Sequence, residues 1–153
     1  MKKFFMLLLP MFLLLAGCSP KVEVSQNGIE VSQVKVRLSS AGMAGMHDND
    51  GTPAAGFMTI KNANGQADTL LGVSADFGDA ELHETVMLDG VMSMRPVAGL
   101  EIPAGAMVEL RSGSYHIMIM NPRAGINEGD VVNITLKFEK AGEVVVPAHV
   151  SNK

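Results

Sequence analysis

The chain has 153 residues, 47% of them hydrophobic, and a formal net charge of −4 at pH 7. This length corresponds to one domain. An acidic chain without basic runs is a poor nucleic-acid binder, so we expect no nucleic acid among its partners. Its only cysteine is Cys18, which excludes an intrachain disulfide, whereas methionine occurs 12 times.

Residues 1–17 are expected to be a lipoprotein signal peptide and not part of the fold. The apolar run from Phe4 to Leu15 follows two lysines. It is shorter than the ~20 residues that a membrane-spanning helix needs. The sequence Leu15-Ala16-Gly17-Cys18 resembles a bacterial lipobox. That resemblance implies acylation of Cys18 on the periplasmic side of a bacterial membrane, and Ser19 in place of Asp favours the outer membrane. The alternative is an ordinary cleaved signal with an incidental cysteine.

Lipidation of Cys18 would use the only thiol of the chain. A blue-copper electron-transfer site requires a cysteine ligand, so this class of site is excluded. A site made of histidine and methionine also avoids disulfide formation in an oxidising compartment. We expect residues 18–27 to tether the domain to its lipid and residues 28–153 to form that domain.

Short runs rich in Val, Ile, Thr and Phe alternate with turn signals along the rest of the chain, and no long helical stripe occurs. Residues 39–56 are rich in Gly and Ala and predict a long loop. The pattern predicts an all-β fold, either a β-sandwich or a barrel. The predicted strands are residues 29–38, 57–61, 69–73, 81–88, 91–96, 107–110, 116–120, 131–138 and 143–150.

The dipeptide Asp89-Gly90 lies between two apolar runs and predicts a β-hairpin with a two-residue type I′ turn. Such a turn would set Thr85 opposite Met94 and His83 opposite Pro96. His83 and Met94 would then be diagonal neighbours on one face, about 7–8 Å apart and within reach of long side chains.

A second pair of similar residues is predicted within one strand. Alternate side chains of a strand share a face and lie roughly 6.5–7 Å apart. His116 and Met118 would therefore share one face, while Ile117 and Ile119 would point the other way, into the core.

His83, Met94, His116 and Met118 form a set of neutral, borderline-to-soft ligands that suits Cu(I) better than other common metals. Taken singly, each methionine is more often a core filler than a ligand, and a lone histidine is usually structural. The joint arrangement favours a four-ligand site. The spacing alone does not show that the two His/Met pairs meet.

The segment from His83 to Met118 resembles the periplasmic copper chaperone family that supplies the copper A site of cytochrome c oxidase. The family pattern His-x10-Met-x21-His-x-Met fits without a gap. Flanking text is also similar, including Met94-Arg95-Pro96-Val97, Ile102-Pro103-Ala104-Gly105 and Leu136-Lys137-Phe138-Glu139.

This resemblance covers roughly residues 30 to 150. It implies a cupredoxin-like (immunoglobulin-like) β-sandwich that binds Cu(I) as its cofactor. It also implies delivery of the copper to cytochrome c oxidase, directly or through a thiol copper-transfer protein. The anchored chain would thus have a copper-accepting protein and the membrane as partners.

Further methionines are secondary candidates. Met43, Met46 and His47 could add a weak copper site, or could belong to a loop with incidental methionines. Met87 and Met92 share the hairpin face of the first pair, where they could shield the ion or pass it on, although core packing is the expected role.

The sequence offers no nucleophile–base pair, phosphate loop or catalytic carboxylate pair, so we expect no enzyme. Two other functions stay open beside the chaperone. One is a periplasmic copper buffer used in tolerance, with the same site and no dedicated acceptor. The other is a structural lipoprotein whose methionines serve only in packing.

Overall fold

The computed structural model describes residues 22–38 and 53–151. These ranges contain strands and turns and no helix, so the all-β prediction is confirmed. Within them, no helix is long and apolar enough to cross a membrane. The strands are β1 (Val22–Gln26), β2 (Ile29–Leu38), β3 (Ala54–Asn62), β4 (Asp68–Ala75), β5 (Asp79–Leu88), β6 (Val91–Pro96), β7 (Leu100–Ile102), β8 (Met107–Leu110), β9 (Tyr115–Met120), β10 (Val131–Phe138) and β11 (Glu143–Ser151).

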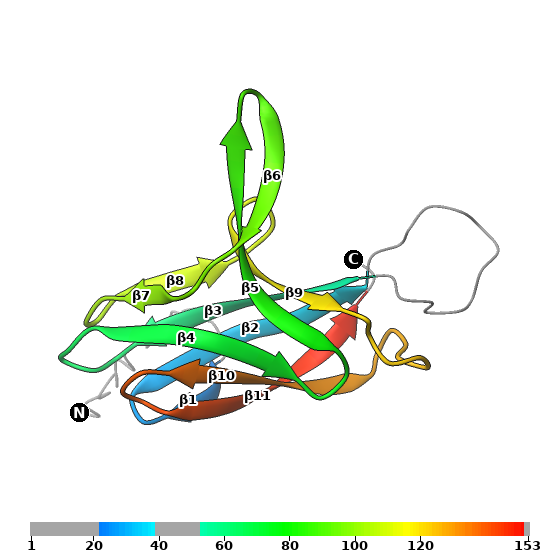
Figure 1. The fold of residues 1–153 in the computed structure, drawn as a ribbon. Helices are drawn as coiled ribbons and strands as arrows, with labels where there is room; N and C mark the ends of the chain where they lie inside the picture. The colour runs from blue at the N-terminus through cyan, green and yellow to red at the C-terminus, as the bar shows by residue number, and fades with distance from the viewer. Residues whose placement is uncertain (1–21, 39–52, 152–153) are drawn as a thin grey trace, which may run out of the picture.

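The strands are hydrogen-bonded in the order β6-β5-β9-β3-β2-β11-β10-β4-β7, with β1 added to β2 and β8 added to β3. The β2–β11 pair is parallel, and every other named pair is antiparallel. The sheet folds over itself so that its two halves face each other (Figure 1). The expected cupredoxin-like β-sandwich is thereby confirmed.

The core lies between these two halves. Burial alternates along β10 and β11, as expected for strands with one face in the core and one in water. Ile117 and Ile119 of β9 are fully buried, as predicted. Gly56 allows close packing of the layers, because a Cβ there would lie 3.2 Å from Ile117 Cβ and 3.3 Å from Ile134 Cδ1.

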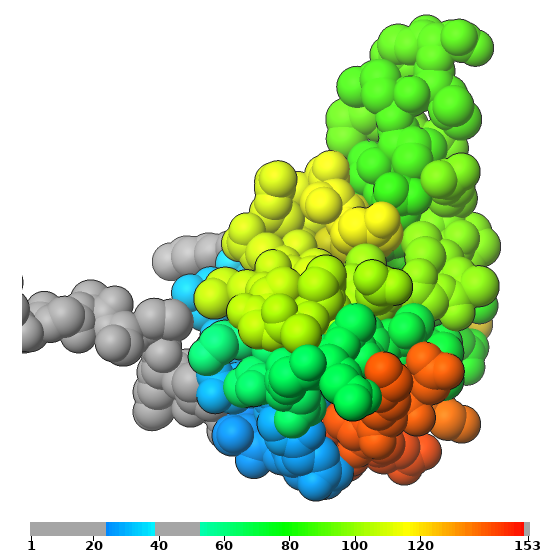
Figure 2. Space-filling model, turned by 90° about the vertical axis from the view of Figure 1, so that its left-hand side faces the viewer, coloured from blue at the N-terminus to red at the C-terminus, as the bar shows by residue number. Residues whose placement is uncertain are grey.

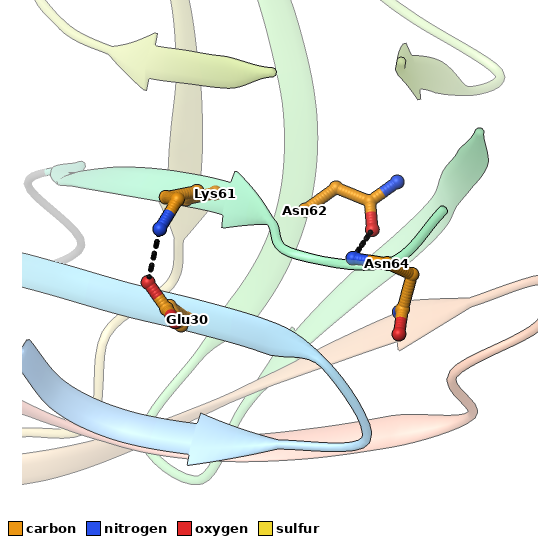
Figure 3. A network of polar contacts seen from close by, with 4 residues as sticks. All are labelled: Glu30, Lys61, Asn62 and Asn64. Atoms are coloured by element: carbon orange, nitrogen blue, oxygen red, sulfur yellow. Dashed lines mark hydrogen bonds and ion pairs between the residues drawn. The ribbon is translucent and has the colours of Figure 1, made fainter. Parts of the chain in front are cut away.

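Asn62 connects the end of β3 to the loop that follows it and to the end of β7 from a fully buried position. Its Nδ2 donates to the carbonyl oxygens of Gln66, at 2.8 Å, and Ile102, at 3.0 Å. Its Oδ1 accepts the backbone N–H of Asn64 at 3.0 Å (Figure 3). These bonds satisfy the amide, which would otherwise be costly to bury. One residue earlier, Lys61 forms an ion pair with Glu30 of β2.

The side chain of Asp68 joins the start of β4 to the β10–β11 turn through hydrogen bonds. It is 1% exposed. It accepts backbone N–H groups from Thr69, Lys140 and Ala141 at 2.7–2.9 Å. Burial raises the pKa of this carboxyl, but the three N–H donors and the nearby Lys140 charge outweigh burial and lower the pKa below its usual value.

The β5–β6 hairpin projects from the sandwich as a two-stranded ribbon (Figures 1 and 2). Asp89 and Gly90 both have positive φ, at 49° and 80°, as a type I′ turn requires. The pairing sets Thr85 opposite Met94 and His83 opposite Pro96, so the predicted register is confirmed. Every residue of β6 is exposed.

All the predicted strands are present, but two short strands were missed and several strands extend beyond their predicted ends. Residues 22–26 were expected in the tether and instead form β1, which pairs with β2 and extends the sheet. The predicted loop over 39–56 is wrong at its end, because β3 already begins at Ala54 and pairs with β2 and β9. β7 has only the three residues Leu100–Ile102, too few to display a periodicity.

Replacement of Asp68 by Asn tests the role of this buried carboxylate. We expect Asp68→Asn to lower the free energy of unfolding by about 1–3 kcal/mol at pH 7, because one or more buried N–H groups would lose a strong acceptor. The pKa of the Asp68 carboxyl is lower in the folded state than its unfolded value of 3.8, so the ionised carboxylate stabilises the fold above pH 3.8. This stabilisation is lost as the pH falls through the lower pKa of the folded state and the carboxylate becomes protonated. Urea unfolding from pH 7 to pH 3 should therefore show the wild type approaching the variant. A constant difference would contradict this role.

Candidate metal centre

The candidate site lies where β5 changes partner. The first half of β5 pairs with β9, and its second half pairs with β6. His83 belongs to both ladders: it is directly opposite His116 of β9 and directly opposite Pro96 of β6. Met94 is therefore a diagonal neighbour of His83, and Met118 follows His116 by two residues on the same strand. One register thus gathers all four predicted residues.

All four residues lie on the outer face of the sheet, away from the core. Their strand neighbours Leu82, Ile117 and Ile119 are buried and belong to the core cluster. This alternation fixes which side chains can reach a ligand, because a slip by one residue would exchange the faces. The core therefore determines the orientation of the site.

The two imidazole rings face each other across the β5–β9 ladder. Their centroids are 6.0 Å apart, and the ring planes are tilted by 58°. Residues directly opposite each other have Cβ atoms about 4.5–5.5 Å apart, so the pairing alone keeps His83 and His116 close. The spacing in the sequence could not establish this contact.

The ring of His116 is 5% exposed and is oriented by a backbone carbonyl. Its Nδ1 lies 3.0 Å from the carbonyl oxygen of Ser114. Because a carbonyl can only accept, Nδ1 carries the proton, and Nε2 keeps its lone pair. The same carbonyl accepts the Thr85 backbone N–H at 3.1 Å, which joins this loop to β5.

The ring of His83 is oriented by a carboxylate. Its Nε2 lies 3.1 Å from Oε2 of Glu81, two residues earlier on the same face. Nε2 is therefore the donor, and Nδ1 keeps the lone pair. Nδ1 of His83 is buried and has no hydrogen-bond partner among the described residues. A buried nitrogen without a partner is costly, and a bound cation would satisfy it.

The two thioethers and the His116 imidazole border one cavity, whereas His83 is not among its lining residues. Met94, His116 and Met118 line a cavity of about 180 Å³ together with Thr85 and Met92. Met118 is half-buried, whereas Met94 is 58% exposed. The cavity thus has a buried side at β9 and a side at the hairpin that is open to solvent.

A third strand and a loop close the other side of this cavity. Ala55 of β3 is directly opposite Met118, and its small side chain leaves room above the sheet. Phe57 continues the wall, with the Arg37 guanidinium 5.0 Å from its ring centroid. This stacking is a cation–π contact that keeps the Arg37 side chain along the aromatic surface.

Each of the two imidazoles has one ring nitrogen held by a hydrogen bond. Nearly all metal-ligating histidines donate their second ring nitrogen to a carbonyl or carboxylate, as both rings do here. Within the described ranges, no group of three or more His, Cys, Asp or Glu residues could hold a metal ion. The other predicted donors on this face are the thioethers of Met94 and Met118.

Other predicted residues have different outcomes. Cys18 and the Met43, Met46 and His47 loop lie outside the described residues. The expected core packing of Met87 and Met92 is wrong: these side chains are 64% and 62% exposed, because the hairpin extends beyond the sandwich.

The two groups that orient the rings were not predicted from the sequence. Glu81 could have been found, since a carboxylate two residues from a histidine shares its face in a strand. The Ser114 carbonyl could not, because it belongs to the backbone and leaves no mark in the sequence.

Comparison with known proteins places the chain in a family. It is 28% identical over 144 residues to "Putative lipoprotein Lxx21020" from Leifsonia xyli subsp. xyli, covering 87% of this chain and 81% of the relative. Among solved structures, the copper-bound PCuAC domain from PmoF2 is similar with a TM-score of 0.64 and 26% identity, over 86% of this chain and 98% of that one.

The solution structure of Cu(I)-bound DR1885 from Deinococcus radiodurans is similar with a TM-score of 0.57 and 26% identity, over 80% and 79% of the two chains. The family described as "Putative lipoprotein LpqE-like" matches residues 29–150, which is the whole sandwich from β2 to the end of β11 apart from its last residue. The chain therefore belongs to the LpqE-like lipoprotein family.

Proposed function

We propose that this protein is a lipid-anchored copper carrier that binds one Cu(I) ion and transfers it to another protein. The ligands would be His83 Nδ1, His116 Nε2 and the thioether sulfurs of Met94 and Met118. The observation that carries this proposal is the buried Nδ1 of His83, which has no hydrogen-bond partner in the part of the chain that the structure describes and belongs to a residue on the face shared with the other three donors.

The donor set supports copper in its reduced state. Thioethers are soft, uncharged ligands that favour Cu(I), while Cu(II) prefers harder nitrogen and oxygen ligands in tetragonal geometry. Two imidazoles and two thioethers give a total charge of zero, so the bound monovalent ion keeps its positive charge. Both rings are already held in the tautomer that leaves one lone pair towards a metal, which lowers the ordering cost of binding.

The solved relatives support the same cargo. One of the similar structures is a copper-bound domain and another is a Cu(I)-bound protein, each 26% identical to this chain. We extend this cargo to the present protein because its own residues provide a suitable donor set. Copper is the transported substrate in this proposal, so the protein performs no catalysis.

The asymmetry of the site suits transfer. His116 and the backbone around it are buried, whereas Met94 is 58% exposed on the hairpin. An acceptor can therefore displace the exposed thioether first and leave the buried imidazole for last. Each exchange replaces one bond to copper by another, and no electrons are transferred.

The acceptor that the family resemblance implies is cytochrome c oxidase, reached directly or through a thiol copper-transfer protein. Acylation of Cys18 would keep the carrier at the periplasmic side of the membrane, where an outer-membrane position is the expectation from Ser19. The description of the family as lipoproteins agrees with an anchor of this kind.

Loss of both imidazoles should abolish tight copper binding. We expect the His83→Ala/His116→Ala variant to lose more Cu(I) affinity than the ~10–100-fold that removal of an outer-shell partner typically costs. Anaerobic competition of the full chain against a Cu(I) chelator measures this affinity. Thermal unfolding of the variant, followed by circular dichroism, checks that the fold is kept.

His149→Ala provides the matched control, because His149 is an exposed histidine on β11, which pairs with β10 and β2 and not with the strands of the site. This control should hold copper as the wild type does. Equal copper retention by the folded double variant would refute the proposed ligand set.

A strain without this protein tests the direction of copper flow. Under copper limitation we expect its cytochrome c oxidase activity to fall, because the acceptor site would be filled more slowly. The wild-type chain should restore the activity, and the His83→Ala/His116→Ala variant should not. Unchanged oxidase activity together with sensitivity to excess copper would instead identify a copper buffer.

A further inference from the structure

Three methionines form a line on one face of the projecting hairpin. Met87 of β5 is directly opposite Met92 of β6, next to the turn. Met94 lies two residues from Met92 and therefore on the same face. We call Met87, Met92 and Met94 the thioether ladder. It leads from the hairpin tip to the candidate site.

Packing does not explain the thioether ladder. The three side chains are 64%, 62% and 58% exposed. Beyond the last residue pair of the β5–β9 ladder, the hairpin has no further strand beside it in the described ranges. A two-stranded ribbon in water gains little from such exposed apolar side chains. Their exposure leaves the three sulfur atoms accessible to a ligand.

The ladder is continuous with the candidate site. Met92 and Met94 line the same cavity as His116 and Met118. Directly opposite residues have Cβ atoms about 4.5–5.5 Å apart, so Met87 and Met92 can bring their sulfurs to one ion. Met94 is placed between this pair and the imidazoles, and it can contribute to either position.

The chemistry of the face is selective. The hairpin face that carries the thioether ladder also carries the hydroxyl of Thr85. The Glu84–Arg95 ion pair lies on the opposite face of the hairpin. Leu88 and Val91 also point to that opposite face and are exposed there. A surface for general apolar contact would not need sulfur, but a soft monovalent cation would require it.

We propose that Met87 and Met92, with Met94, form a second Cu(I)-binding position at the hairpin tip, through which copper enters or leaves the main site. The step is a ligand exchange: a bond from copper to the Met92 sulfur forms as a bond to a histidine nitrogen breaks. The copper stays Cu(I), and no proton needs to move to or from a thioether. This inference rests on the proposed copper-carrier function.

The test is a titration of the full chain, carrying 13C-labelled methionine methyl groups, with Cu(I) in detergent micelles under anaerobic conditions. The first equivalent should shift the Met118 methyl signal and the ring signals of both site histidines. The second equivalent should shift the Met87 and Met92 methyl signals. Met107 is the matched control, because it is 59% exposed on β8, a strand that pairs with β3 and not with the hairpin.

In the Met87→Leu variant, which leaves every cavity-lining residue in place, the first equivalent should bind as before, and the Met92 response to the second equivalent should be lost. Leucine keeps the volume and removes the sulfur, so the fold should tolerate it. Unmoved Met87 and Met92 signals, or a Met107 shift of equal size, would overturn the second position. A missing response of the histidine rings to the first equivalent would instead count against the proposed carrier function.

Discussion

The double pairing of β5 is the constraint on which the site depends. One strand forms a ladder with β9 on one edge and with β6 on the other, and two consecutive residues, His83 and Glu84, belong to both. The hydrogen bonds of these two ladders fix the register, and the register brings a histidine and a methionine from each side to one place. A slip of one residue would turn the donors towards the core and the isoleucines towards water.

The two faces of β5 and β9 have different roles. The inner face, with Leu82, Ile117 and Ile119, is buried and stabilises the fold, while the outer face presents the donor atoms. Glu81 and the Ser114 carbonyl then orient the two rings. Because the hairpin extends beyond the sandwich, one thioether side of the site stays open to solvent while the imidazole of His116 is enclosed. A carrier needs both properties, retention of the ion and a route for its release.

The sequence predicted those parts that local patterns determine. Strand periodicity and the Asp89-Gly90 turn were sufficient for the hairpin register, including the diagonal relation of His83 to Met94. The contact between His83 and His116 is a long-range pairing, and only the resemblance to a known family pointed to it. The exposure of Met87 and Met92 was also missed, since an apolar pattern in a strand is the same whether a neighbouring layer covers it or not. β1 was mistaken for a tether because its short alternating run adjoins the signal-like segment.

The central claim is that two imidazoles and two thioethers from these strands converge on one copper ion. X-ray absorption at the copper edge, on the full chain loaded with one equivalent of Cu(I), tests this most directly. We expect nitrogen and sulfur atoms together to coordinate the copper in the wild type, and fewer sulfur atoms to coordinate it in the Met94→Leu/Met118→Leu variant. A wild-type shell of nitrogen and oxygen alone, or a sulfur contribution that the variant leaves unchanged, would contradict it.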